Sequence, residues 1–297
     1  MHIPDMMIQG IVCPVTGALA AVGVAGAAYA ACKTRIKPVA SLFAGVTALI
    51  FAAQMANFPI HLGTSGHLLG ATLAVALLGS AFGIMAMSLV VIAQCLVFAD
   101  GGISVLGANL LNIALISSLP AVFVLERFSA MPYKKTAYFV AAFVATVLAA
   151  GVCAVQLAIS GAAPLSSVLP AMLSIHVLLG LAEAGLTVTL LAVMTHHAAS
   201  KITSQRAWII PLGIATIIAV LVSPFASALP DGLESVACAL SLGSGTLFAA
   251  PFAEYAIPNV ASEVLSTALA GFVGIVLLFV VAYGTGRALV RSGERSA

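Results

Sequence analysis

Charged side chains are scarce in this sequence. Only 7% of its 297 residues are Asp, Glu, Lys or Arg, whereas 62% are hydrophobic. A soluble globular domain carries about a quarter charged residues, so this composition excludes that class. The apolar runs are rich in Ala, Gly, Leu and Val, and the small residues among these let helices pack closely in lipid. The composition therefore predicts an all-α, polytopic helical membrane protein.

Common catalytic signatures are also missing. The sequence contains no GxxxxGK[ST] phosphate loop, no HExxH and no GxSxG, so it gives no support to ATP hydrolysis by a P-loop or to the common hydrolase reactions. Its five cysteines are scattered and include no CxxC pair. Neither a disulfide framework nor a zinc–thiolate site is predicted from them.

Nine apolar segments are near the length that crosses a bilayer. They are residues 11–32, 38–57, 67–83, 84–99, 108–126, 137–159, 171–195, 208–228 and 264–286. All 11 Lys and Arg follow the first, fifth, seventh or ninth of these spans. Because basic residues are retained on the cytoplasmic side, we predict an outer N-terminus and a cytoplasmic C-terminus, as an odd number of spans requires. The expected location is the bacterial inner (plasma) membrane.

Acidic residues show the opposite distribution. On this topology Asp5, Asp100, Asp231, Glu234, Glu254 and Glu263 all lie outside. An outer face with acids and without Lys or Arg attracts divalent cations. Acids also tolerate translocation without serving any function, and both interpretations stay open.

The chain starts Met1-His2, and a free N-terminus followed by histidine is a potential metal chelate. The Met1 amine, the His2 backbone nitrogen and the His2 imidazole place three nitrogens in one plane, which is typical of Ni(II) or Cu(II). A neutral imidazole is a common fourth donor, and His67, in the glycine-rich turn 63–67 on the same outer face, is a candidate for it. The alternative is an ordinary frayed terminus. His61, in the same outer loop, is interpreted as an interfacial side chain.

Polar residues within the spans add two further candidates. His176 and Glu183 lie seven residues apart on one face of the seventh span, where an ionisable residue is a functional hypothesis. Asn109 and Asn112 share a face of the fifth span and can orient a loop by hydrogen bonds. Pairing between helices is the structural alternative for both pairs.

Two modules are predicted along the chain. Residues 1–206 hold seven spans and the histidines of interest. Residues 207–297, called here the C-terminal module, hold two spans around an outer segment, 229–263, that opens Pro230-Asp231-Gly232-Leu233-Glu234. Carboxylates are hard oxygen donors, so we expect this module to act in transport rather than in metal capture.

These motifs together resemble the NikM/CbiM family, the substrate-binding (S) components of energy-coupling-factor transporters for nickel and cobalt. The resemblance rests on the Met1–Asp5 start, the turn that ends at His67, Asp100-Gly101-Gly102 and the segment 107–112, and it covers residues 1 to about 206. The Pro230–Glu234 string resembles a fused NikN-type module. Met6 departs from the commoner Pro-Asp-Gly start, which affects the turn but no ligand.

The resemblance implies the site and the partners. The metal ligands would be Met1, His2 and His67, with Asp5, Ser65, Asn109 and Asn112 as possible supporting residues around them. A membrane-embedded coupling (T) component and cytoplasmic ATPase subunits would complete an ATP-driven transporter, and this chain itself would not be an enzyme.

The expected cargo is Ni(II), carried as substrate and not as a catalytic cofactor. Planar ligation with a deprotonated amide suits low-spin Ni(II) better than Co(II), and the Pro230–Glu234 segment resembles the nickel systems. Cobalt uptake by the same architecture is the alternative. A second alternative is a secondary carrier or membrane enzyme that uses His176 and Glu183.

Overall fold

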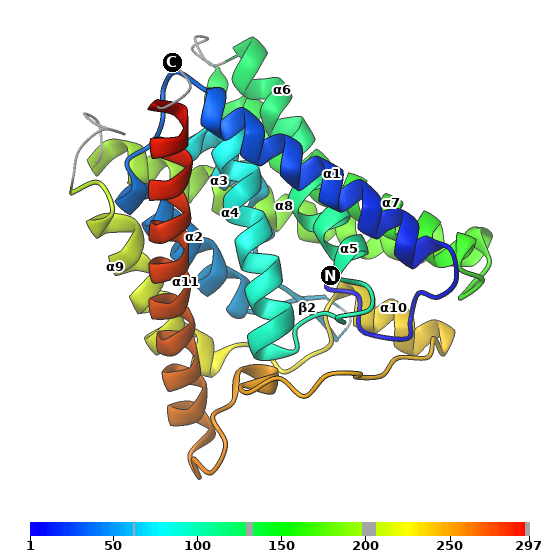
Figure 1. Ribbon diagram of the computed structural model, residues 1–297. Coiled ribbons are helices and arrows are strands. Elements are labelled where there is room, and N and C mark those ends of the chain that lie inside the picture. The colour runs from blue at the N-terminus through cyan, green and yellow to red at the C-terminus, as the bar shows by residue number, and fades with distance from the viewer. Residues whose placement is uncertain (62, 129–132, 198–205, 295–297) are drawn as a thin grey trace.

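The computed structural model of the protein describes residues 1–61, 63–128, 133–197 and 206–294, and most of them are helical (Figure 1). The first part of the chain forms α1 (Val12–Lys33), α2 (Ala40–Met55), β1 (Phe58–His61), β2 (Thr64–Gly66), α3 (Ala71–Leu78) and α4 (Ser80–Ala93) with its π-helical end η1 (Gln94–Phe98). It continues with α5 (Leu106–Asn109), η2 (Leu110–Leu115), η3 (Ile116–Ser118), α6 (Leu119–Phe128), α7 (Lys134–Ile159) and α8 (Leu165–His197). The C-terminal module forms α9 (Ile209–Ile217), η4 (Ile218–Val222), η5 (Ser223–Phe225), α10 (Gly232–Leu240), η6 (Ala253–Tyr255) and α11 (Glu263–Glu294).

Six of the described helical stretches are long and apolar enough to cross a membrane. They are Val12–Lys33, Ser80–Phe98, Leu106–Phe128, Lys134–Ile159, Leu165–Thr195 and Glu263–Ser292, and shorter apolar stretches cover Ala40–Met55 and Ile209–Phe225. A helix satisfies its own backbone hydrogen bonds, as a lipid environment requires. The predicted class, a helical multi-pass membrane protein, is confirmed.

Helix α2 occupies the centre of the bundle. Every residue from Ser41 to Met55 is buried, and α2 packs against α4, α9 and α11. A helix that is apolar on all sides suits this position. The C-terminal module therefore packs into the same bundle as the preceding helices, with α11 running along α2.

The third predicted span, 67–83, is not one helix, and this prediction is wrong. The chain is non-helical from His67 to Gly70, forms the eight-residue helix α3, and breaks at Gly79 before α4 begins. Eight residues of helix cover about 12 Å, less than half of a bilayer core. Gly70 and Gly79 cause the breaks, because both have positive φ angles, +86° and +83°, that other residues rarely adopt.

Basic residues gather at one end of the bundle. The C-terminal ends of α1, α6 and α11 lie together in Figure 1, away from the N-terminus. The Nζ atom of Lys37 donates to the carbonyl oxygens of Leu289 and Val290, at 3.5 and 3.2 Å. Lys201 and Arg295 lie outside the described residues. This grouping agrees with the pattern on which the orientation rests, and the assignment of this end to the cytoplasm stays a prediction.

Candidate metal centre

The N-terminal segment folds back into the bundle. Met1 and His2 are each 7% exposed, and Ile3 is fully buried. Asn109 holds this segment through both ends of its side-chain amide, because Ile3 N donates to its Oδ1 at 2.8 Å and its Nδ2 donates to Ile3 O at 3.0 Å. Gly102 N donates to the same carbonyl at 2.9 Å. Asn109 thus fixes the backbone next to the predicted ligands.

Asp5 closes the turn that follows. Its Oδ1 accepts from the Ser104 backbone and hydroxyl at 2.8 and 2.6 Å, and its Oδ2 accepts from Leu247 N at 3.0 Å. Burial raises the pKa of this acid, but the hydrogen bonds from Ser104 and Leu247 outweigh it and hold the pKa below its usual range. Met6 then adopts a φ of +68°, the conformation that glycine takes most easily. The turn therefore forms with Met6 in place of glycine.

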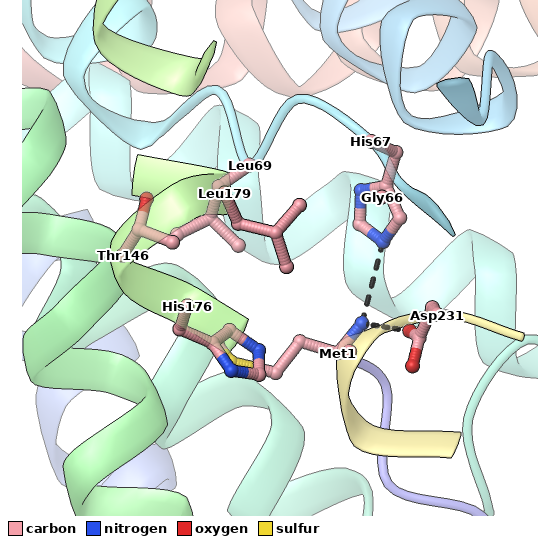
Figure 2. Close-up of a pocket in the computed structure, with 9 residues that line it drawn as sticks. Met1, Gly66, His67, Leu69, Thr146, His176, Leu179 and Asp231 are labelled. Carbon is pink, nitrogen blue, oxygen red and sulfur yellow. Dashed lines mark hydrogen bonds and ion pairs between the residues drawn. The ribbon is translucent and has the colours of Figure 1, made fainter. Parts of the chain in front are cut away.

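The Met1 amine lies between an imidazole and a carboxylate (Figure 2). Its nitrogen is 3.4 Å from His67 Nε2 and forms an ion pair with Asp231. Burial lowers the pKa of the amine, but the Asp231 carboxylate outweighs it and raises that pKa above its ordinary value. His67 Nδ1 is 3.1 Å from Leu68 O, a bond in which it donates, so Nε2 presents its lone pair to the amine. Burial and the neighbouring terminal ammonium lower the pKa of His67 to about 4.

The His2 imidazole stacks on that of His67, with ring centroids 5.6 Å apart and planes inclined by 23°. His2 Nδ1 lies 3.0 Å from Asp100 Oδ1, whereas its Nε2 is buried without a hydrogen-bond partner among the described residues. The Tyr255 hydroxyl donates to Asp100 Oδ2 at 2.6 Å. Burial raises the pKa of Asp100, but the adjacent His2 and the Tyr255 hydrogen bond hold it well below its usual range. His2 is thus oriented by a carboxylate that the C-terminal module supports.

The Pro230–Glu234 string forms the turn that positions Asp231. Asp231 Oδ1 accepts from Leu233 N and Glu234 N at 2.8 and 2.9 Å, and Glu234 Oε2 accepts from Asp231 N at 2.8 Å, which makes a complete capping box for α10. A Cβ atom on Gly232 would lie 2.8 Å from His176 Cε1, so a larger residue would force the His176 side chain to shift. The string therefore positions Asp231 and packs against His176 at the candidate metal centre.

Ser65 connects β2 to this turn. Its backbone nitrogen donates to Pro230 O at 2.8 Å, and its hydroxyl donates to Leu229 O at 2.6 Å. It therefore supports Asp231 through the two carbonyl groups that precede it in the chain. Asn112 lies elsewhere: it exchanges two hydrogen bonds of 2.8 Å with Gln156, which ties η2 to α7.

His176 and Glu183 serve different parts of the molecule. His176 lines a cavity of about 20 Å³ together with Met1, His67 and Asp231, which is room for one water molecule (Figure 2). Its Nδ1 is 2.7 Å from Met172 O, and its Nε2 is unpaired within the described ranges. Glu183 instead accepts from Leu69 N and Gly70 N at 2.5 and 2.9 Å. It satisfies the backbone of the non-helical stretch that carries His67.

Three residues of this centre were not singled out as site residues from the sequence. Asp100 and Asp231 were among the outer acids, so the charge distribution carried a weak signal for them. Tyr255 carried none, because its role depends on a contact with Asp100 that lies 155 residues away in the chain.

The terminal amine and the two imidazoles that lie buried together in this helical membrane protein are nitrogen donors of the kind that borderline transition metals prefer. The chain matches the family model described as the cobalt uptake substrate-specific transmembrane region, CbiM, over residues 2–201, and the PDGLE domain over residues 205–291. The protein therefore belongs to the CbiM family, here joined to a PDGLE domain, and the resemblance to NikM/CbiM is confirmed.

The relatives agree with this assignment. The chain is 35% identical over 301 residues to a putative fused nickel transport protein NikMN of Archaeoglobus fulgidus, covering 97% of this chain and 98% of that protein. It is 28% identical to a probable fused nickel transport protein LarMN of Lactiplantibacillus plantarum, over 73% of each. A crystal structure of a transition metal transporter aligns with a TM-score of 0.60 and 26% identity over 71% of this chain and 99% of that one. This protein is a membrane component for nickel or cobalt transport.

Proposed function

We propose that this protein is the substrate-binding component of an ATP-driven energy-coupling-factor transporter that imports Ni(II). The metal is held by four nitrogens in a plane: the Met1 amine, the His2 amide and imidazole nitrogens, and His67 Nε2. The observation that carries this proposal is the burial of the amine 3.4 Å from His67 Nε2, with the His2 ring stacked beside them. Adjacent ligands on one ion with bonds of about 2 Å lie roughly 2.8 Å apart, so a small approach of these two nitrogens suffices.

The His2 ring has to turn before the chelate closes. The chelate uses Nδ1, because that nitrogen lies nearest the backbone, whereas Nδ1 now faces Asp100. Rotation about the Cβ–Cγ bond releases Nδ1 to the metal and brings Nε2 to the side of Asp100. A metal-bound histidine typically donates its other ring nitrogen to a carboxylate, and Asp100 is placed for that role.

Nickel is favoured over cobalt by ligand geometry. A planar field of nitrogens, one of them a deprotonated amide, suits low-spin Ni(II). The names of the Archaeoglobus and Lactiplantibacillus relatives, both nickel transport proteins, support the same choice. Cobalt(II) uptake is the alternative, and it predicts a paramagnetic complex where nickel predicts a diamagnetic one.

The partners follow from the family and from what the chain lacks. The sequence has no P-loop, so ATP hydrolysis belongs to separate cytoplasmic ATPases that act through a membrane-embedded coupling component. Nickel uptake in cells should therefore require co-expression of those subunits. Uptake by this chain alone would favour a secondary carrier instead.

An N-terminal extension of several residues tests the site, because a single added residue would place the histidine third from a new amine and build another planar four-nitrogen chelate. An extension before Met1 moves the amine and breaks the first chelate ring, while it leaves both imidazoles in place. Isothermal titration with Ni(II) should show tight binding for the protein that starts at Met1 and a loss of that binding for the extended form. Equal affinity would remove the amine from the ligand set.

A further inference from the structure

Asp231 divides its two carboxylate oxygens between two tasks. Oδ1 caps α10 by accepting from Leu233 N and Glu234 N. Oδ2 is left over and forms the ion pair with the Met1 amine. The side chain that begins a helix of the C-terminal module is thus also the counter-ion of the chain terminus, 230 residues away.

The position of this carboxylate is fixed independently of the N-terminus. Ser65 holds the preceding carbonyls of Leu229 and Pro230. The capping box with Glu234 fixes the backbone of Asp231 itself. Gly232 packs against His176 and Leu179 on the next side. These contacts come from residues outside the N-terminal segment, so they position Asp231 at the cavity that Met1 and His67 also line.

The N-terminus needs such an anchor. A charged terminal amine that enters a buried site loses its hydration, and this cost is recovered only by a charged partner. The hydrogen bonds of Asn109 and Asp5 hold the segment from residue 3 onward and involve other atoms than the Met1 amine. His67 offers a neutral nitrogen at 3.4 Å, and Asp231 offers the charge.

We propose that Asp231 is the docking group of the free N-terminus. Its carboxylate keeps the Met1 amine beside His67 before a metal arrives. The inference rests on the proposed function only where it treats the amine as a ligand. Once metal binds, the neutral coordinated amine still carries N–H groups that can donate to Oδ2. The C-terminal module thereby takes part in metal capture by presenting a ligand, without supplying a donor atom to the metal.

Reactivity of the terminal amine tests this role in the full-length protein. The metal-free protein is treated with an amine-acylating reagent, and modification of the N-terminal peptide is followed by mass spectrometry. Asp231→Asn keeps the cap and removes the charge, and Asp231→Ser keeps the cap but is too short to reach the amine, since Asn and Ser are both good N-caps. Glu234→Gln is the matched control, because glutamine can keep the capping box while the change removes the same charge from an exposed residue of the same turn, whose side chain accepts from Asp231 N.

We expect Asp231→Ser to raise the acylation rate of the metal-free terminus by about tenfold or more, the size of a lost charged hydrogen bond, and Asp231→Asn to give a smaller rise. Glu234→Gln should react like the wild type, and Ni(II) should protect every form. A wild-type terminus that reacts as fast as that of Asp231→Ser, or an equal rise in Glu234→Gln, overturns the docking role. If Asp231 variants react faster but Ni(II) protects none of the proteins, docking stands and the metal site is refuted.

Discussion

The two parts of the chain that meet at this centre bring different atoms to it. Residues 1–206 bring the nitrogens: the Met1 amine and the imidazoles of His2 and His67. The C-terminal module brings the Asp231 carboxylate, the Tyr255 hydroxyl and the backbone amides that hold Asp5. Nitrogen donors select a borderline transition metal, whereas the oxygen groups neutralise and orient those donors. Under the docking proposal for Asp231, a division between ligation and support replaces the expectation that the module acts in transport rather than in metal capture, and that expectation itself stays untested.

Removal of a nitrogen donor should have the largest effect. His67→Ala leaves water at the fourth corner, and because loss of a supporting residue already costs about 10- to 100-fold in metal affinity, loss of a ligand should exceed that range. Isothermal titration with Ni(II) measures it. His61→Ala, in the same loop, should bind Ni(II) like the wild type. If the damage follows His61 instead, the wrong histidine has been assigned.

Acid should weaken binding through the amine and not through His67. The pKa of His67 is lowered to about 4, so this imidazole is neutral across the physiological range. Asp231 raises the pKa of the Met1 amine above its ordinary value of about 8. Protons therefore compete with the metal for the amine at every pH below that raised pKa. Affinity should already fall as the pH decreases from above the ordinary amine value of about 8, roughly tenfold per pH unit for each proton released. A flat profile in titrations that cross this value would exclude amine and amide ligation.

Removal of the support should cost less than removal of a ligand. Asp100→Asn takes away the carboxylate that orients His2, and we expect about a 10- to 100-fold loss of Ni(II) affinity. Tyr255→Phe removes one hydrogen bond to that carboxylate, worth about 1 kcal/mol or roughly fivefold. In the double variant Tyr255→Phe should add nothing, because its effect passes through Asp100. Additive losses would show a separate role for Tyr255.

The same comparison separates what the sequence predicted from what it did not. Met1, His2 and His67 were predicted as one ligand set because chelation depends on chain order and donor type; the structure brings the three residues together, and their binding of a metal stays a prediction. Asp231 and Tyr255 were not predicted as site residues, because their contacts depend on how the C-terminal module packs against the N-terminal segment and Asp100. The composition predicted the helical class, but it did not predict the non-helical breaks around α3. Hydropathy gives no information on backbone angles such as the positive φ of Gly70 and Gly79.

Substitution of Glu183 should lower the stability of the fold rather than directly impair metal binding or transport. Glu183→Gln replaces one acceptor oxygen by a donor, so either Leu69 N or Gly70 N loses its partner. A buried amide without a partner lowers the free energy of unfolding by about 1–3 kcal/mol. Thermal unfolding of the metal-free protein checks this, with Ser174→Ala, on an exposed part of α8, as the control. If Glu183→Gln abolishes metal uptake without lowering the stability of the protein, Glu183 acts in cation passage instead.

The smallest effect should come from Met6, where the N-terminal turn meets the C-terminal module. A non-glycine residue in the left-handed region strains the folded state by about 1–2 kcal/mol. Glycine relieves this strain, but it also stabilises the unfolded chain by about 0.4–1 kcal/mol through its larger conformational entropy. Met6→Gly should therefore raise the free energy of unfolding by up to about 1 kcal/mol, which thermal unfolding can detect. Ni(II) affinity should stay the same, because Asp5 keeps its bonds to Ser104 and Leu247 and Asn109 still holds Ile3. Met6→Ala keeps the strain and should leave stability near that of the wild type, so equal gains in both variants would locate the effect in the Met6 side chain and not in its backbone.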